Sequence, residues 1–250
     1  MRIPAIHGLI QRRILVTYRV DPAIVSALLP SPFEPQIVRG HAVAGICLIQ
    51  LAQVRPGFWP ADWGLASQNA AHRFAVTWHD GEVEFQGVFI PRRDTSSWAT
   101  VLLGGRLFAG VHHHARFLTR ESADDLQISV ASDDGKVAIQ VEARPGGKWQ
   151  SELFDSPHAA SDFYRHGARG YSPALAPNKC EGLELVSERW HARPLAVNAI
   201  RSSFFADESV FPPGSAEFDC ALEMRNIPHR WEPLAPLGTT EQYQGTVAVC

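Results

Sequence analysis

Apolar and polar residues alternate along several stretches of the chain, and a period of two predicts strands. Residues 12–20 are rich in β-branched side chains, and residues 41–54 form a long apolar run typical of a buried strand with its flanks. Two alternating runs, residues 72–79 and 82–91, flank an Asp-Gly pair. Because Asp-Gly suits the tight turn between paired strands, we predict a β-hairpin here.

Helical spacing is confined to short segments. Asp21 and Pro22 can begin a helix over residues 23–29, which the following prolines end. A second short helix is predicted near residues 98–107, with a serine or threonine cap before it. Residues 151–167 indicate either a capped helix or an insertion, which could extend to residue 170.

Strand character returns in the rest of the chain, and a second Asp-Gly turn joins two of these strands. Many strands, hairpin turns and few short helices predict an α+β fold made mainly of antiparallel β-structure. Closing the sheet into a barrel would remove the exposed edges of so many strands. We find no linker, so one domain over residues 1–250 is expected. The later strands are predicted at residues 111–121, 126–132, 137–143, 183–205 and 217–227.

Composition and charge argue against several classes of function. The 250 residues carry a formal net charge of −3 and no block of Lys or Arg, so binding to nucleic acid or to an anionic membrane has no electrostatic support. No run approaches the roughly 20 apolar residues of a membrane span. The N-terminus lacks a signal-peptide core, so a soluble, cytoplasmic protein is expected. The four cysteines are dispersed and indicate reduced packing residues rather than a zinc or redox motif: Cys47, Cys180, Cys220 and Cys250.

Three consecutive histidines, residues 112–114, are the most conspicuous chemical feature. If they lie on a strand, His113 shares a face with Val111, Ala115 and Phe117 and points inward. An inward imidazole in a cavity can act as acid, base or hydrogen-bond donor. A structural histidine bonded to backbone is the alternative.

The polar face of the same strand would carry His112 and His114. Such a His-x-His pair can chelate zinc if another histidine supplies a third ligand. Arg116 beside the pair disfavours a divalent cation, so no metal is expected and a metal enzyme remains a minor alternative. No glycine-rich nucleotide motif occurs, so no cofactor is expected either.

The stretch "VTYRVDPAIVSALLPSPFEP" (residues 16–35) resembles the N-terminal signature of the acetoacetate-decarboxylase-like superfamily. The segments "GGRLFAGVHHHARF" and "ERWHARPLAV" are most similar to its uncharacterised YqjF-like branch. The resemblance implies a cone-like antiparallel β-barrel that holds a small-molecule cavity. It agrees with the fold class that the pattern predicts. The matching residues are Tyr18, Arg19, Asp21, Pro30, Pro32, Phe33 and Glu34.

The decarboxylases of that superfamily use a pair of lysines, one of which forms a Schiff base with a β-keto acid. Counted without gaps from Arg106, that pair falls on His113 and His114. Imidazole forms no stable imine, and the three lysines, Lys136, Lys148 and Lys179, lie away from this segment. Schiff-base decarboxylation is therefore not expected.

The supporting residues of the decarboxylases are also missing. Gln11 stands roughly where they have an active-site arginine, and only Asp62 supplies a carboxylate between Gly45 and His72. The sequence therefore differs from those decarboxylases at further active-site positions besides the lysine pair.

Other residues are candidates for ligand binding. Arg73 could enter the cavity and bind a carboxylate, and Arg106 could do so near the end of its helix. Trp59 and Trp63 lie in a loop that could form a rim over the pocket, and His191 follows a tryptophan that could line it. Each of these residues could equally have a purely structural role.

The sequence thus favours a protein, or an enzyme of unknown reaction, that binds a small carbonyl or carboxylate compound. His113 and His114 are its expected catalytic residues. A non-catalytic ligand-binding or structural barrel, with its cavity filled by side chains, is the main alternative. Because relatives of this type often assemble, a homo-oligomer is expected.

Overall fold

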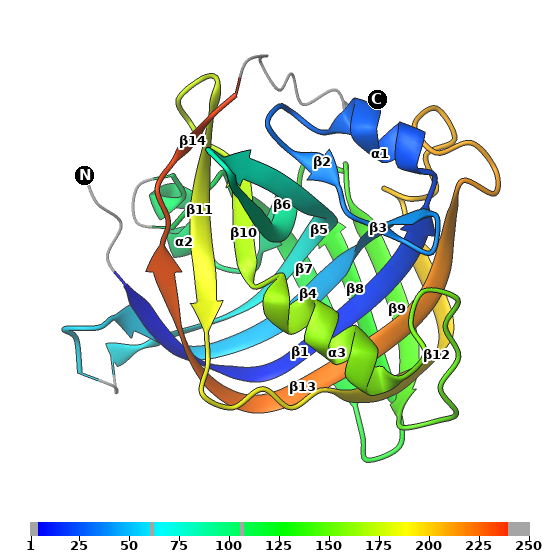
Figure 1. Cartoon of the computed structure of the whole chain (residues 1–250). Helices are drawn as coiled ribbons and strands as arrows, with labels where there is room; N and C mark the ends of the chain where they lie inside the picture. Colours follow the sequence, from blue (N-terminus) through cyan, green and yellow to red (C-terminus); the bar gives the residue numbers. More distant parts are fainter. Residues whose placement is uncertain (1–4, 61–62, 106–107, 240–250) are drawn as a thin grey trace.

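The computed structural model describes residues 5–60, 63–105 and 108–239, and its strands form one sheet that curls around on itself (Figure 1). Nine strands pair in succession and close a ring, because β6 pairs with β5 as well as with β7. Every pair in this ring is antiparallel except β6–β7. The ring consists of β1 (Ile6–Val20), β4 (His41–Pro56), β5 (Leu65–Asp80), β6 (Val83–Thr95), β7 (His113–Glu121), β8 (Leu126–Ser132), β9 (Ala138–Pro145), β12 (Arg193–Ser202) and β13 (Ala216–Pro233).

Two further strands close a second ring on the other side of the same sheet. β10 (Arg169–Pro173) pairs in parallel with β6, and β11 (Lys179–Val186) pairs with both β10 and β13. The two rings therefore share β13, β1, β4, β5 and β6, and each shared strand has one face toward each ring. Three two-residue strands complete the described sheet: β2 (Glu34–Pro35), β3 (Ile37–Val38) and β14 (Leu237–Gly238).

Side chains on the two faces of the shared strands form two apolar clusters. Ile14 and Val16 of β1 join a cluster to which all nine strands of the first ring contribute, and Phe204 packs into it. Leu15, between them in sequence, joins the second cluster. This opposite placement follows from the alternation of side chains along a strand. The sheet therefore has one apolar cluster on each of its two faces.

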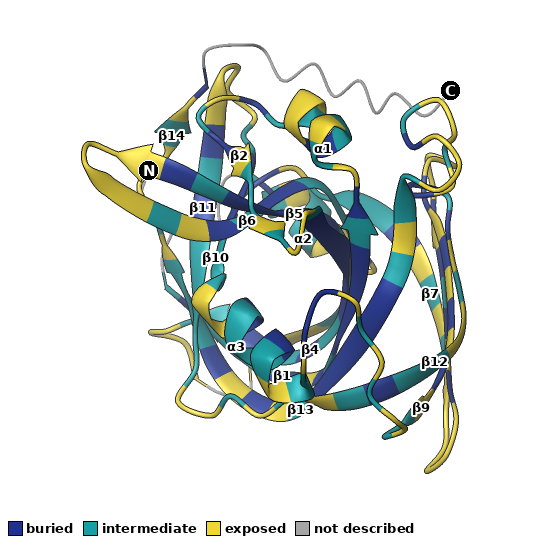
Figure 2. Ribbon diagram, turned by 45° about the vertical axis from the view of Figure 1, so that its right-hand side comes forward, coloured by how far each residue is buried: buried dark blue, intermediate teal, exposed yellow. Residues whose placement is uncertain are grey.

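Three short helices lie outside the sheet, and each begins at a side-chain cap. Asp21 accepts a hydrogen bond from Ala23 N at the start of α1 (Pro22–Leu28), as predicted. Ser97 caps α2 (Trp98–Leu103). Ser156 caps α3 (Pro157–His166), and Figure 2 shows buried and exposed positions along the same helix where it lies beside β1 and β13. Among the described residues, no helix has the length and apolar character needed to cross a membrane.

The α+β, mainly antiparallel fold class predicted from the sequence is confirmed. The Asp-Gly hairpin is confirmed as β5 and β6, and the segment before residue 167 is a capped helix. Several predicted boundaries were wrong, and β1 and β5 begin well before the predicted residues 12 and 72. α2 ends at Leu103, and β7 begins at His113 instead of residue 111. The start of β7 places His113 and His114 on the strand and His112 before it.

Candidate functional site

A cavity of about 160 Å³ lies inside the second ring. Residues of β1, β4, β5, β6, β10, β11 and β13 line it, and the segment 108–112 closes one side. Most of the lining is apolar. The polar exceptions include three arginines, one cysteine and one histidine: Arg13, Arg73, Arg93, Cys47 and His112.

Strand register brings the charged residues together. Cys47 on β4 stands opposite Ala71 on β5, and Ala71 stands opposite Arg93 on β6. Arg13 stands opposite Ile49 on β4, and Arg73 stands opposite Gly45. Since Gly45 and Ile49 lie two residues on either side of Cys47, both arginines are its diagonal neighbours on the same face. The small side chain of Ala71 leaves the space between Cys47 and Arg93 open.

The three guanidinium groups lack carboxylate partners among the described residues. Arg13 Nε donates to Cys47 Sγ at 3.4 Å, and Arg93 Nε donates to Ser172 Oγ at 2.8 Å. The guanidinium carbon of Arg73 lies 4.6 Å from the centre of the Tyr164 ring. Positive charge therefore accumulates on one wall of the cavity without neutralisation by the described residues.

Burial weakens the basicity of two of these cations. Burial lowers the pKa of Arg93 to about 10, and it also lowers the pKa of Arg73. Arg13 Nη1 and Arg73 Nη2 are buried and have no hydrogen-bond partner among the described residues. Unsatisfied buried N–H groups are rare in folded proteins because each one costs free energy. Two such groups therefore lie among the side chains of the cavity wall.

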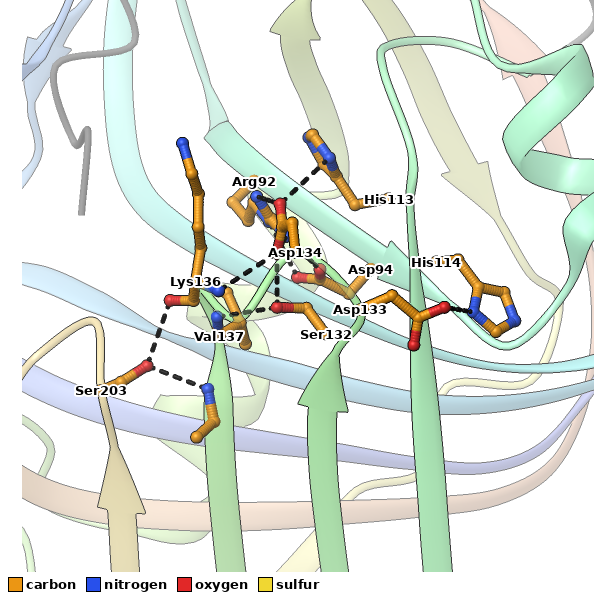
Figure 3. A network of polar contacts seen from close by, with 11 residues as sticks. Arg92, Asp94, His113, His114, Ser132, Asp133, Asp134, Lys136, Val137 and Ser203 are labelled. Atoms are coloured by element: carbon orange, nitrogen blue, oxygen red, sulfur yellow. Dashed lines mark hydrogen bonds and ion pairs between the residues drawn. The ribbon is translucent and has the colours of Figure 1, made fainter. Parts of the chain in front are cut away.

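One carboxylate, that of Asp94, does line the cavity, but it is already engaged. Both of its oxygens accept hydrogen bonds from Arg92, at 2.8 to 3.3 Å. Arg92 also binds Asp134, on the turn between β8 and β9. This network fastens β6 to the adjacent turn and leaves Asp94 unable to neutralise the cavity arginines (Figure 3).

His112 is the member of the histidine triplet that lines the cavity. Its Nδ1 lies 3.1 Å from the carbonyl oxygen of Gly110 and donates to it, which leaves Nε2 as the acceptor of a neutral ring. Burial, with a smaller contribution from Arg93, lowers the pKa of His112 to about 3. The ring is therefore a neutral polar group at physiological pH.

His113 does not line the cavity. It shares a face of β7 with Ala115 and Phe117, which pack into the first cluster, but it lies at the end of the strand. Its side chain is 39% exposed, and its Nδ1 lies 3.6 Å from Asp134 Oδ2 (Figure 3). Gly110 takes a positive φ of 80° shortly before the strand begins at His113. The neighbouring His112 lies on the side of the cavity and lines it.

His114 also lies outside the cavity lining. Its ring stacks on Trp98 with centroids 4.1 Å apart, and its Nδ1 lies 2.7 Å from Asp133 Oδ2 (Figure 3). The structure therefore separates His114 from His112. Within the described ranges, no group of three or more histidine, cysteine or acidic side chains could hold a metal ion.

The other predicted ligand-binding residues lie in different parts of the molecule, and not all of them line the cavity. Arg73 lines the cavity, whereas Trp59 and Trp63 are exposed near the β4–β5 connection and do not line it. His191 borders a surface groove beside α3. Arg106 lies outside the described residues. The role of each in binding stays a prediction.

Sequence reasoning missed several cavity residues: Arg13, Arg93, His112 and Cys47. The signal for Arg13 was its position on the strand of Gln11, where the superfamily's decarboxylases have an arginine. Gln11 itself is exposed. Arg93 belongs to an Arg-Arg-Asp run in which alternation separates the two arginines onto opposite faces.

Comparisons with known proteins agree with the fold. The family described as DUF2071, "Uncharacterized conserved protein (COG2071)", matches residues 10–221. No curated protein matches the chain.

Solved structures of low sequence identity share the architecture. An acetoacetate decarboxylase-like enzyme from Sphingomonas wittichii RW1 is 14% identical with a TM-score of 0.62, over 96% of this chain and 95% of that one. The acetoacetate decarboxylase of Legionella pneumophila subsp. pneumophila str. Philadelphia 1 is 12% identical with a TM-score of 0.54, over 92% and 87%. The enduracididine biosynthesis enzyme MppR, complexed with pyruvate, is 10% identical with a TM-score of 0.57, over 94% and 91%. These likenesses establish an acetoacetate-decarboxylase-like fold.

Proposed function

This chain belongs to the DUF2071 family of uncharacterised conserved proteins, and we propose that its cavity binds a small organic carboxylate. The observation that carries the proposal is the set of three arginines on the cavity wall, which form no ion pair within the described residues: Arg13, Arg73 and Arg93. A guanidinium group presents N–H donors in the fork geometry that a carboxylate accepts. A bound carboxylate would neutralise part of this charge and occupy the unpartnered donors.

The size of the cavity limits the ligand. A cavity of about 150 Å³ is known to hold a benzene-sized molecule, and this cavity measures about 160 Å³. The ligand is therefore a compound of roughly six to eight non-hydrogen atoms. The apolar part of the lining suits a short aliphatic group beside the carboxylate.

A structural relative supports this class of ligand. MppR, which shares the fold, has been solved in complex with pyruvate. Pyruvate has a carboxylate, a keto group and a methyl group, which would suit the arginines, the polar His112 and the apolar lining respectively. We therefore place small 2-oxo acids first among the candidate ligands.

Schiff-base chemistry is not part of the proposed function. All three lysines are exposed, and none lines the cavity. Histidine acid/base chemistry stays a second proposal, but a ring with a pKa near that of His112 is a weak base at pH 7. We assign His112 the role of a neutral hydrogen-bond partner.

The non-catalytic ligand-binding or structural barrel stays an alternative, although its expected feature, a cavity filled by side chains, does not match the open cavity of about 160 Å³. A non-catalytic binding protein and an enzyme both fit an open cavity. A homo-oligomer stays a prediction.

Ligand-observed NMR with a panel of small acids tests the proposal. Pyruvate, acetoacetate and their uncharged methyl esters would be compared on the wild type, on Arg73→Met and on Arg116→Met. Arg116 is the matched control because its side chain is 85% exposed and lies outside the cavity. We expect acids but not esters to bind, and Arg73→Met to weaken binding about tenfold or more. Equal binding of acids and esters would contradict the proposal.

A further inference from the structure

Cys47 occupies the centre of the charged wall. Its two diagonal neighbours across the sheet are Arg13 and Arg73, and Arg93 lies beyond the small Ala71 in the same row. Among the described cysteines it is the one that lines the cavity. The side chain is 8% exposed, so a reagent reaches the sulfur through the cavity.

The surroundings of Cys47 favour its charged form. Arg13 Nε donates to Sγ at 3.4 Å, and a thiolate accepts such a bond better than a thiol does. Burial alone would raise the pKa of the Cys47 thiol, but the charges of Arg13, Arg73 and Arg93 outweigh burial and hold the pKa below its ordinary value. A thiolate is the nucleophilic form of cysteine.

Two other cysteines of the same chain provide an internal contrast. Cys180 and Cys220 are buried in apolar clusters, and burial raises the pKa of each to about 12. Neither lines the cavity. The three thiols therefore differ in charge environment although all three are buried.

A further observation concerns a hydrogen-bond donor near this sulfur. Arg73 is 5% exposed and lines the cavity, and its Nη2 has no hydrogen-bond partner within the described ranges. A carboxylate that accepts a hydrogen bond from this nitrogen would lie on the same face of the sheet as Cys47, beside a residue that is its diagonal neighbour.

We propose that Cys47 is a nucleophile of the cavity, and that its Sγ adds reversibly to the carbonyl carbon of a small 2-oxo acid or aldehyde acid. The proposal rests on the carboxylate binding proposed above and narrows it to acids with an electrophilic carbonyl. A bond forms between Sγ and the carbonyl carbon, while the π pair of the C=O bond moves onto oxygen. That oxygen takes a proton from water, and the product is a hemithioacetal or hemithioketal. The step is neither an oxidation nor a reduction, and its reversal restores both partners.

Alkylation with a charged and an uncharged reagent tests the site on the whole chain. The experiment uses a Cys250→Ser background, because that cysteine lies outside the described residues. Iodoacetate and iodoacetamide each form an Sγ–CH₂ bond as iodide leaves, but only iodoacetate carries a carboxylate. Peptide mass spectrometry would give the rate at Cys47, with Cys180 and Cys220 as internal references.

We expect iodoacetate to modify Cys47 about tenfold or more faster than iodoacetamide, because the arginines concentrate the anion in the cavity. Arg73→Met should reduce the iodoacetate rate far more than the iodoacetamide rate. Arg116→Met should leave both unchanged. Pyruvate should protect Cys47 from iodoacetate.

The addition itself is tested with glyoxylate labelled with ¹³C at its aldehyde carbon. The wild type should give a bound carbon resonance distinct from those of the free aldehyde and its hydrate, and Cys47→Ser should not. If small acids bind with dependence on Arg73, yet Cys47 gives no adduct and no preference for iodoacetate, the nucleophile is wrong while the proposed function stands. If the acids do not bind at all, both proposals fail.

Discussion

The guanidinium carbon of Arg73 lies 4.6 Å from the centre of the Tyr164 ring, with no carboxylate of the described residues paired to it. Tyr164 belongs to α3, and its hydroxyl lies 2.5 Å from Thr17 Oγ1 on β1. An aromatic ring fixed in this way attracts the cation through its face. The helix thereby holds Arg73 at the cavity wall, where its Nη2 has no hydrogen-bond partner among the described residues.

This arrangement predicts opposite effects of Arg73→Met on stability and on binding. An unpaired buried charge costs free energy, so its replacement by an apolar side chain of similar length should leave the free energy of unfolding unchanged or raise it by about 1 kcal/mol. Affinity for a small acid should fall about tenfold or more. Urea denaturation and calorimetric titration measure the two quantities. A variant that is less stable than the wild type but binds normally would show that Arg73 has a structural role.

The histidine triplet allows a test that separates neighbours in sequence. His112→Ala should weaken the binding of a small acid about three- to tenfold, as expected for one lost hydrogen bond. His113→Ala should leave the affinity unchanged, because its ring pairs with Asp134 outside the cavity lining. Calorimetric titration of both variants shows which of the two histidines contributes to binding. Weaker binding by His113→Ala alone would restore the placement that strand alternation predicted.

The buried His72 predicts a loss of stability in acid. Burial, with a smaller contribution from Arg92, lowers its pKa to about 3, whereas an unfolded histidine titrates near 6.5. Between these two pKa values the unfolded chain binds a proton at His72 that the folded chain does not bind. The contribution of His72 to the free energy of unfolding is therefore fully present above about pH 6.5 and is lost as the pH falls toward 3. Between pH 7 and pH 5 this amounts to about 2 kcal/mol.

His72→Gln removes this titration. Its free energy of unfolding, measured by urea denaturation, should therefore fall less between pH 7 and pH 5 than that of the wild type, by about 2 kcal/mol. An equal loss of unfolding free energy between pH 7 and pH 5 in the variant and in the wild type would mean that folding does not lower the pKa of His72.

The buried ion pair of Asp94 and Arg92 predicts that removing one partner will strongly lower the free energy of unfolding. The Asp94 side chain is fully buried and accepts hydrogen bonds from two nitrogens of Arg92. Asp94→Asn leaves the guanidinium with Asp134 alone and should lower the free energy of unfolding by about 3 kcal/mol. Asp133→Asn is the matched control, because that side chain is 35% exposed and should cost less than about 1 kcal/mol. Equal effects in urea denaturation would contradict this difference.

Much of the fold could be predicted because the controlling signals are local. Asp80-Gly81 supports the β5–β6 turn, and the caps at Asp21 and Ser156 mark helix starts. The strand β10 was not predicted, because its five residues gain their place through a parallel pairing with β6, which is distant in sequence. The second ring, and with it the cavity, depends on that pairing.

The candidate site was harder to predict from the sequence, because it also depends on pairing between strands that are distant in sequence. Cys47 and Arg93 lie in one row only through two registers, β4 with β5 and β5 with β6, and no local pattern contains both. Alternation did suggest that Arg73 could enter the cavity. It could not show that the cavity belongs to the second ring, which His112 lines and His113 does not.

The binding of a small acid to the arginine wall is tested most directly by a crystal structure of the protein with pyruvate. We expect the carboxylate to lie within hydrogen-bond distance of Arg73 or Arg93, with the methyl group against the apolar lining. A cavity that contains only water at saturating pyruvate, or a pyruvate whose carboxylate faces away from the arginines, would contradict the account.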